Sequence, residues 1–105
     1  MVILQMNKGG WVYILTNQRH TVLYVGVTSD LVVRIQEHRQ KLFPRSFTAR
    51  YNVEKLIYYR SYDRIELAIA NEKRLKGCSR KLKESLIEDQ NPGWKDLWVI
   101  EISKW

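Results

Sequence analysis

The chain has little of several residue types that mark whole classes of protein. It carries one cysteine, Cys78, among 105 residues. This excludes a disulfide framework and a thiolate-rich zinc site and indicates a reducing compartment, by default the cytoplasm. Two prolines and five glycines are too few for a disordered chain. No apolar run approaches the roughly 18 residues that a membrane-spanning helix requires. We therefore expect a folded cytoplasmic protein.

Acidic residues are also scarce relative to basic ones. Eleven Asp and Glu against eighteen Lys and Arg leave a formal charge of +7 and a pI near 9.7. Such a surplus favours polyanionic partners, with nucleic acid as the first candidate, and the alternative is charge that serves solubility alone. What the chain does have is an apolar fraction of 45%, with four Trp and six Tyr, which is enough for one small core.

Residue patterns predict a small α+β domain. Two β-rich segments, 11–16 and 22–27, flank a short polar connection and indicate a hairpin, and a third strand is expected at 53–62. Pairing Thr16 with Thr21 across the connection places Tyr13 opposite Tyr24 on one face of the sheet. The fold class predicted is a small antiparallel or mixed sheet of about three strands, flanked by helices in the order ββαβαα.

Three helices are expected between and after these strands. The first begins at Leu31 and carries apolar residues at helical spacing to position 42. The second begins at a capping box formed by Asp63 and Glu66 and ends at Gly77. The third covers 79–89, with an apolar stripe that includes Leu82, and 41–52 is predicted to be a loop. The state of the last stretch, from Trp94 onward, is left open.

The domain boundaries predicted from these patterns are an N-terminal extension at 1–8, one domain at 9–98 and a C-terminal tail at 99–105. The opening Met1-Val2-Ile3-Leu4-Gln5 is too short for a signal-peptide core and is followed by a second methionine, Met6. We expect these opening residues to lie outside the fold. Cys78 stands in a basic turn and is interpreted as a small filler residue.

Polar side chains interrupt the apolar stripes of two predicted helices. Arg34 and His38 lie one turn apart near the end of the hairpin, where both can face a phosphate; the alternative is a solvated cation and a boundary histidine. Glu72 falls on the apolar face of the second helix, where a carboxylate costs free energy without a cation. It is therefore the best candidate ligand for a divalent ion, the alternative being an ion pair with Lys76. For Tyr13 and Tyr24, the alternative to catalysis is an ordinary cross-strand aromatic pair.

Five short motifs follow one another along the chain: Trp11-Val12-Tyr13-Ile14-Leu15, Leu23-Tyr24-Val25-Gly26-Val27-Thr28, Arg34 with His38, Ala70-Asn71-Glu72-Lys73, and Asn91-Pro92-Gly93-Trp94-Lys95-Asp96-Leu97. In this order and spacing the chain resembles the GIY-YIG nuclease superfamily. More narrowly, it is similar to the small stand-alone bacterial branch related to the catalytic domain of the excision-repair incision subunit. Two departures stand out, since the glycine of the first motif is displaced by one position and Val25 replaces an isoleucine.

The resemblance implies metal-dependent hydrolysis of a nucleic-acid phosphodiester and a role for each matching residue. Tyr13 and Tyr24 match the two motif tyrosines, and the Tyr24 position is the one expected to act as general base toward water. Arg34 is expected to stabilise charge on the scissile phosphate, and His38 to support a phosphate or a proton relay. Glu72 would hold one Mg²⁺ or Mn²⁺, with water and phosphate oxygens completing the shell.

Two further positions and two basic clusters complete the expected site. The resemblance gives Gly26 a tight backbone turn beside the site and Asn91 an architectural role. The residues expected to contact nucleic acid are Lys41, Arg45, Arg50, Lys73, Arg74, Lys76, Arg80, Lys81 and Lys83. The cations at 41–50 alternate with aromatic residues, an arrangement suited to unpaired strands. The alternatives are a solvated helix face for the run at 73–83 and, for 41–51, a loop whose aromatics pack on the core.

The predicted function is a metal-dependent endonuclease that acts on DNA, with branched and single-stranded DNA among its possible substrates. The chain leaves no room for a separate DNA-recognition domain, so specificity is open. The competing hypothesis is a nucleic-acid-binding module with weak or no catalysis on the same fold, and a protein scaffold is a third.

Overall fold

The computed structural model describes residues 9–105, and their fold is built on one three-stranded sheet. The strands are β1 (Gly10–Thr16), β2 (Leu23–Thr28) and β3 (Lys55–Tyr62), and β1 is central in the order β2-β1-β3. Both pairings are antiparallel. The predicted α+β class is confirmed, and the sheet is antiparallel rather than mixed. The predicted N-terminal extension lies outside the described residues.

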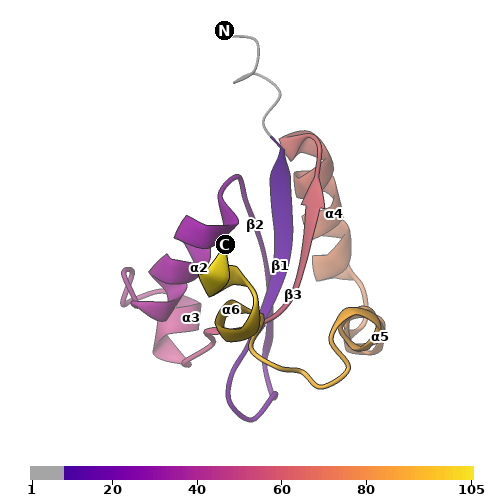
Figure 1. Ribbon diagram of the computed structural model, residues 1–105. Coiled ribbons are helices and arrows are strands. Elements are labelled where there is room, and N and C mark those ends of the chain that lie inside the picture. The colour runs from indigo at the N-terminus through magenta and orange to yellow at the C-terminus, as the bar shows by residue number, and fades with distance from the viewer. Residues whose placement is uncertain (1–8) are drawn as a thin grey trace, which may run out of the picture.

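Helices cover both faces of the sheet (Figure 1). The front layer, as we name it, consists of α2 (Leu31–Arg39), α3 (Phe47–Arg50) and α6 (Leu97–Ile100). The back layer consists of α4 (Ile65–Gly77) and α5 (Arg80–Gln90), and the chain ends in a 3-10 turn, η1 (Ile102–Lys104). None of the described helices has the length and apolarity needed to cross a membrane.

Alternation along β1 divides the core between the two layers, because successive side chains point to opposite faces of a strand. The buried front cluster contains Tyr13, Leu15, Leu31, Ile35, Val53, Leu56, Leu97 and Ile102. The buried back cluster contains Val12, Ile14, Val25, Ile57, Tyr58, Ala68, Leu75 and Ile87. A central strand that is buried on both faces explains why the segment 11–16 is apolar almost throughout.

The register of the hairpin differs from the prediction by two residues. Thr16 pairs with Leu23, two positions beyond the predicted partner, so Tyr13 does not lie directly opposite Tyr24. The cause is a longer connection, in which the Asn17 side-chain oxygen accepts hydrogen bonds from two backbone N–H groups of the loop. A shift of two residues keeps every side chain on its predicted face. The two tyrosine rings are therefore still neighbours, with centroids 6.4 Å apart.

Three local predictions about the helices were wrong. The segment 41–52 is not all loop, because the Ser46 hydroxyl accepts a hydrogen bond from the Ala49 N–H (3.3 Å) and starts α3. The second helix begins after Arg64 with no side-chain cap, so the predicted capping box does not form. The third helix begins at Ser79, whose hydroxyl caps it as a good N-cap should. However, its Leu82 side chain is 50% exposed and lies outside the core.

The C-terminal residues pack against the front of the sheet. Asp96 caps α6 by accepting a hydrogen bond from the backbone N–H of Trp98, and it also pairs with Arg39 at 2.8 Å. Ile102 is 1% exposed. The Trp105 ring lies 5.7 Å from that of Trp11 in β1. The segment separated in the sequence as a C-terminal tail thus contributes to the front core.

Candidate active site

Gly26 makes room for the buried ring of Tyr13. The two residues are paired across β1 and β2 and lie on the same face. A Cβ atom built on Gly26 would overlap Cζ and the hydroxyl oxygen of the Tyr13 ring. None of the described glycines has a positive φ, so Gly26 provides a close approach inside a strand and not the predicted turn.

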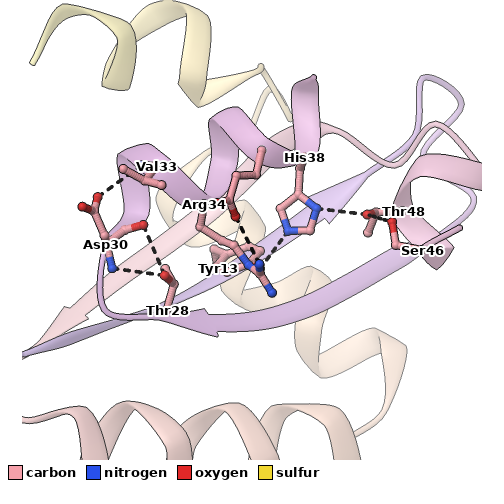
Figure 2. Close-up of polar contacts among 9 residues, drawn as sticks. Tyr13, Thr28, Asp30, Val33, Arg34, His38, Ser46 and Thr48 are labelled. Carbon is pink, nitrogen blue, oxygen red and sulfur yellow. Dashed lines mark hydrogen bonds and ion pairs between the residues drawn. The ribbon is translucent and has the colours of Figure 1, made fainter. Parts of the chain in front are cut away.

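The Tyr13 hydroxyl is the centre of a hydrogen-bonded chain between the sheet and two helices (Figure 2). It lies 2.9 Å from Nε2 of His38, which α2 directs toward the sheet. The other ring nitrogen of His38, Nδ1, lies 3.0 Å from the Thr48 hydroxyl of α3. The Thr48 hydroxyl is in turn 3.3 Å from that of Ser46. Both ring nitrogens of His38 therefore have partners within the protein.

Burial sets the protonation states along this chain. It raises the pKa of Tyr13 to about 12, and the nearby Arg34 opposes the increase only in part. It lowers the pKa of His38 to about 4, with the positive charge of Arg34 as a further cause. At neutral pH the phenol is therefore protonated and the imidazole is neutral. A protonated phenol donates to Nε2, which leaves Nδ1–H to donate to the Thr48 hydroxyl.

Arg34 lies between this chain and solvent. Its Nη1 forms an ion pair with Glu37 at 3.2 Å, and its side chain is 38% exposed. The hydrogen bond with Tyr13 and the charge of Glu37 both raise the pKa of Arg34, so it remains a cation under all ordinary conditions. A partly exposed guanidinium held from behind is well placed to meet a phosphate that arrives from solvent.

Tyr24 and Arg34 line the same cavity on the front layer. Its volume is about 350 Å³, and α2 and α3 form its walls. The Tyr24 side chain is half-buried, and its ring meets that of His38 edge-on at 5.8 Å. The full lining is Tyr24, Arg34, Glu37, His38, Lys41, Phe43, Ser46, Phe47, Thr48 and Ala49. Tyr13 is absent from this lining and fully buried, so the two tyrosines differ in their access to substrate.

Glu72 reaches the site from the back layer. It lies on the buried side of α4 and is 8% exposed. Its Oε2 atom lies 2.6 Å from Nζ of Lys76, one turn later. The negative charge of Glu72 raises the pKa of Tyr13. The pKa of Lys76 is raised chiefly by Glu72 and to a smaller extent by Tyr24. Glu72 therefore interacts electrostatically with Tyr13, and its partner Lys76 with Tyr24, although Glu72 does not line the cavity.

Among the residues described here, no three His, Cys, Asp or Glu side chains cluster as metal ligands. A metal ion at this site would be held by Glu72, the buried carboxylate that the family motif supplies. This fits Mg²⁺, which often binds to one or two carboxylates and completes its shell with water and phosphate oxygens. The buried carboxylate requires a cation beside it, and in this structure Lys76 supplies that charge from a side chain that is 55% exposed.

The predicted nucleic-acid contacts differ in how far other groups already engage them. Lys41 pairs with Glu54 at 3.0 Å, and Arg80 pairs with Glu84 while donating to two backbone oxygens of the hairpin loop. Lys83 donates to the Cys78 carbonyl, and Arg74 to the Asn71 side chain. The described contacts give Lys73, Lys81 and Arg45 no such partner, and all three are exposed.

Asn91 lies away from this site, at the end of α5. Its side-chain Nδ2 donates to the Ile57 and Lys95 carbonyls, and its Oδ1 accepts from the Lys95 N–H at 3.1 Å. The residue is 5% exposed. The bond to Ile57 ties the end of α5 to β3, the two bonds to Lys95 hold the turn that follows α5, and none of the three reaches a residue of the cavity.

Sequence reasoning missed Thr48 and Glu37. Thr48 is 4% exposed and holds His38, but a threonine in a segment interpreted as loop carries no signal of that contact. Glu37 follows Arg34 by three positions on α2, a spacing that places two side chains together on a helix surface. That spacing was the available signal for the ion pair.

Comparison with known proteins agrees with this geometry. The model of the GIY-YIG catalytic domain matches residues 9–85, which include Tyr13, Tyr24, Arg34 and Glu72. The solution NMR structure of the UPF0213 protein BH0048 from Bacillus halodurans is similar, with a TM-score of 0.54 and 25% sequence identity. The match covers 84% of this chain and 92% of that one. Among curated protein sequences, none matches this chain at a significant level. The chain belongs to the GIY-YIG family and carries its catalytic domain.

Proposed function

We propose that this protein is a metal-dependent endonuclease that hydrolyses phosphodiester bonds of DNA, including branched or single-stranded DNA. Its family implies nuclease-type activity on nucleic acid. The observation that carries the proposal is the front cavity, which Tyr24, Arg34 and His38 line together, with the buried Tyr13 bonded to His38 behind them. A hydroxyl group and a guanidinium that share a cavity are what hydrolysis of a phosphodiester requires.

Tyr24 is the proposed general base. The choice between the two tyrosines rests on access and protonation, because Tyr13 is fully buried and has its pKa raised to about 12. In the step proposed, the Tyr24 oxygen accepts a proton from the attacking water as its own proton passes to solvent, and the hydroxide oxygen attacks phosphorus. One P–O bond of the backbone then breaks, and the leaving oxygen takes a proton from solvent. Arg34 stabilises the charge that develops on the phosphate oxygens.

His38 is proposed to act within the hydrogen-bonded chain and not as a phosphate ligand. Both ring nitrogens already have partners, and its lowered pKa leaves the ring uncharged at neutral pH. Of the two roles expected from the sequence, a proton relay is thus the better supported. Thr48 positions the ring, because its hydroxyl holds Nδ1 and so leaves Nε2 facing Tyr13.

Glu72 is the residue proposed to hold the metal ion, which would supply charge stabilisation at the phosphate when bound. The competing function, a nucleic-acid-binding module without catalysis, is favoured by one observation. Lys76 sits 2.6 Å from Glu72 and already neutralises the carboxylate. The two functions therefore differ in whether a divalent ion displaces Lys76 from Glu72.

The test is a cleavage assay on branched, single-stranded and duplex DNA and on RNA, with Mg²⁺ or Mn²⁺. We expect Arg34→Ala and Tyr24→Phe each to lower kcat by about 10²–10³-fold, the usual effect of removing one group that stabilises charge in a transition state. Glu72→Gln should lower the rate similarly and abolish its dependence on metal concentration. Glu66→Gln, which alters an exposed carboxylate in the first turn of the same helix, is the matched control and should retain kcat.

Two outcomes would contradict the proposal. If the wild-type protein cuts none of these substrates, the nuclease assignment falls, and salt-dependent binding that survives Glu72→Gln would leave the binding module in its place. If the wild type cuts but the three variants cut equally well, the assigned residues are wrong.

A further inference from the structure

Aromatic rings leave the catalytic cavity in an ordered series along α3. From His38, the series continues to Tyr24, then to Phe47 and then to Tyr51. The rings of Tyr24 and Phe47 are nearly parallel, with an interplanar angle of 20° and centroids 6.5 Å apart. Those of Phe47 and Tyr51 are 4.9 Å apart. We name Tyr24, Phe47 and Tyr51 the aromatic ladder.

Packing of the core does not explain these rings. The buried residues of α3 are Thr48 and Ala49, which face the sheet. Phe47 and Tyr51 lie one turn apart on the other side, and they are 47% and 50% exposed. The nearby Phe43 is 54% exposed. The interpretation of 41–51 as a loop whose aromatics pack on the core is therefore wrong, and these rings are open to a ligand.

Positive charge accompanies the ladder along its length. Lys41 lines the cavity beside Tyr24. Arg45 and Arg50 are exposed on either side of Phe47, and the Arg50 guanidinium lies 5.7 Å from the centroid of the Tyr51 ring. Beyond Tyr51 a second hollow begins, with a volume of about 580 Å³, and its lining holds Arg19, Arg39 and Lys55 together with Glu54 and Asp96. The ladder thus connects two hollows that both carry cations.

We propose that the aromatic ladder binds unpaired nucleobases next to the phosphodiester that is cut, and that it makes the protein selective for single-stranded over duplex nucleic acid. This inference rests on the proposed function, since it places the cut at the front cavity. Stacked rings and interspersed cations are the features with which proteins bind single strands, because each base offers a face for stacking and each phosphate a charge. In a duplex the base faces are covered by their neighbours, so only the phosphates remain for contact.

The experiment measures binding of fluorescently labelled single-stranded DNA, single-stranded RNA and blunt duplex DNA of one sequence to the full chain. Fluorescence anisotropy in EDTA separates binding from cleavage. The variants are Phe47→Leu and Tyr51→Leu, singly and together, which remove each ring while keeping an apolar side chain. The matched control is Leu67→Ala, which alters an equally exposed apolar residue (49%) on the back layer. Thermal unfolding checks that each variant folds.

We expect each leucine variant to weaken binding of the single strands by about tenfold, the effect of one lost stacking partner. Duplex affinity should change by less than about twofold, because phosphate contacts carry it. Arg45→Ala should weaken all three ligands alike. The DNA and RNA arms show which kind of single strand supplies the bases.

Equal losses for single strands and duplex, or no loss for either, would overturn the ladder. A second assay keeps this outcome distinct from failure of the nuclease. If the wild type cleaves and the leucine variants retain its strand preference, the ladder falls and the nuclease stands. If the variants lose single-strand binding while the wild type cleaves nothing, the ladder stands and the nuclease falls.

Discussion

The front and back layers pack on the same three strands but differ in the side chains that they bury and in how they accommodate polar groups. On the back, α4 and α5 cover apolar side chains, and the one buried charge, Glu72, has a lysine beside it. On the front, the polar side chains of His38 and Thr48 meet the buried Tyr13, and a cavity of about 350 Å³ opens beside them. The back face is filled by packed apolar side chains, and the front face carries a cavity beside a hydrogen-bonded chain of polar side chains.

This difference shows how a protein of 105 residues can carry a site without giving up its core. Small domains have little apolar surface to bury, and each polar group placed inside them must find a partner. None of the buried side-chain nitrogen and oxygen atoms among residues 9–105 lacks a hydrogen-bond partner. The front layer thus concentrates its polar groups in one satisfied network, beside a buried apolar cluster as large as that of the back layer.

The largest effect on the front layer is expected from Gly26→Ala. The new methyl group would overlap the Tyr13 ring, which must then move and lose its bond to His38. Overpacking and one lost hydrogen bond together predict a decrease in the free energy of unfolding of about 2–4 kcal/mol. Urea unfolding measures it. Gly77→Ala is the control, since a methyl group there meets nothing within 4 Å, and equal losses in both variants would contradict the steric explanation.

A smaller effect is expected on the back layer, where stability should fall and kcat should not change. Asn91→Ala removes one hydrogen bond that ties α5 to Ile57 of β3 and two that hold the following turn at Lys95, and it leaves these partners unpaired. We expect about 2 kcal/mol of lost stability, with kcat of the folded protein unchanged. Thr48→Val on the front should instead cost about 1 kcal/mol and lower kcat, and Thr48→Ser should restore both. If the Asn91 variant lowers kcat as much as the Thr48 variant does, the two layers do not divide their roles as described.

The last effect concerns pH. The pKa of His38 is lowered from 6.5 to about 4, so below pH 6.5 the unfolded chain binds a proton that the folded chain does not. Stability is therefore complete above about pH 6.5 and falls as the pH approaches 4. With a discount for partial exposure, the loss is about 1–2 kcal/mol.

Urea unfolding between pH 7.5 and 4 checks this, and His38→Gln should remove most of the slope. His20→Gln is the comparison variant. The His20 ring lies in the hairpin loop, where burial and Lys55 lower its pKa to a lesser extent. If the dependence of stability on pH persists in His38→Gln and disappears in His20→Gln, the effect belongs to His20, and the explanation given for His38 is wrong.

Several features of this division were predictable from the sequence because they depend on local patterns. The three strands and the helices α2, α4 and α5 follow from the spacing of apolar residues, and Ser79 identifies the start of α5. The shared face of Tyr13 and Tyr24 survived an incorrect register because alternation has a period of two. The site residues themselves came from the ordered motifs, and their roles remain predictions.

Other features depend on contacts between distant residues and leave no local trace. The connection at 17–22 is longer than predicted because a single side chain, Asn17, folds it. The bond between Thr48 and His38 joins two elements ten residues apart. The position of Glu72 behind β2 requires knowing how α4 packs on the sheet, which helical periodicity alone does not give.

The contact between the Tyr13 ring and Gly26 has a consequence for how these two positions can change over generations. They belong to different motifs and lie thirteen residues apart, yet the Tyr13 ring fills the space that a side chain at position 26 would need. A library of all side chains at position 26 would return glycine alone while Tyr13 is present, and would admit larger residues only after position 13 has become small. Because position 26 can enlarge only after position 13 has become small, we expect substitutions at the two positions to occur together.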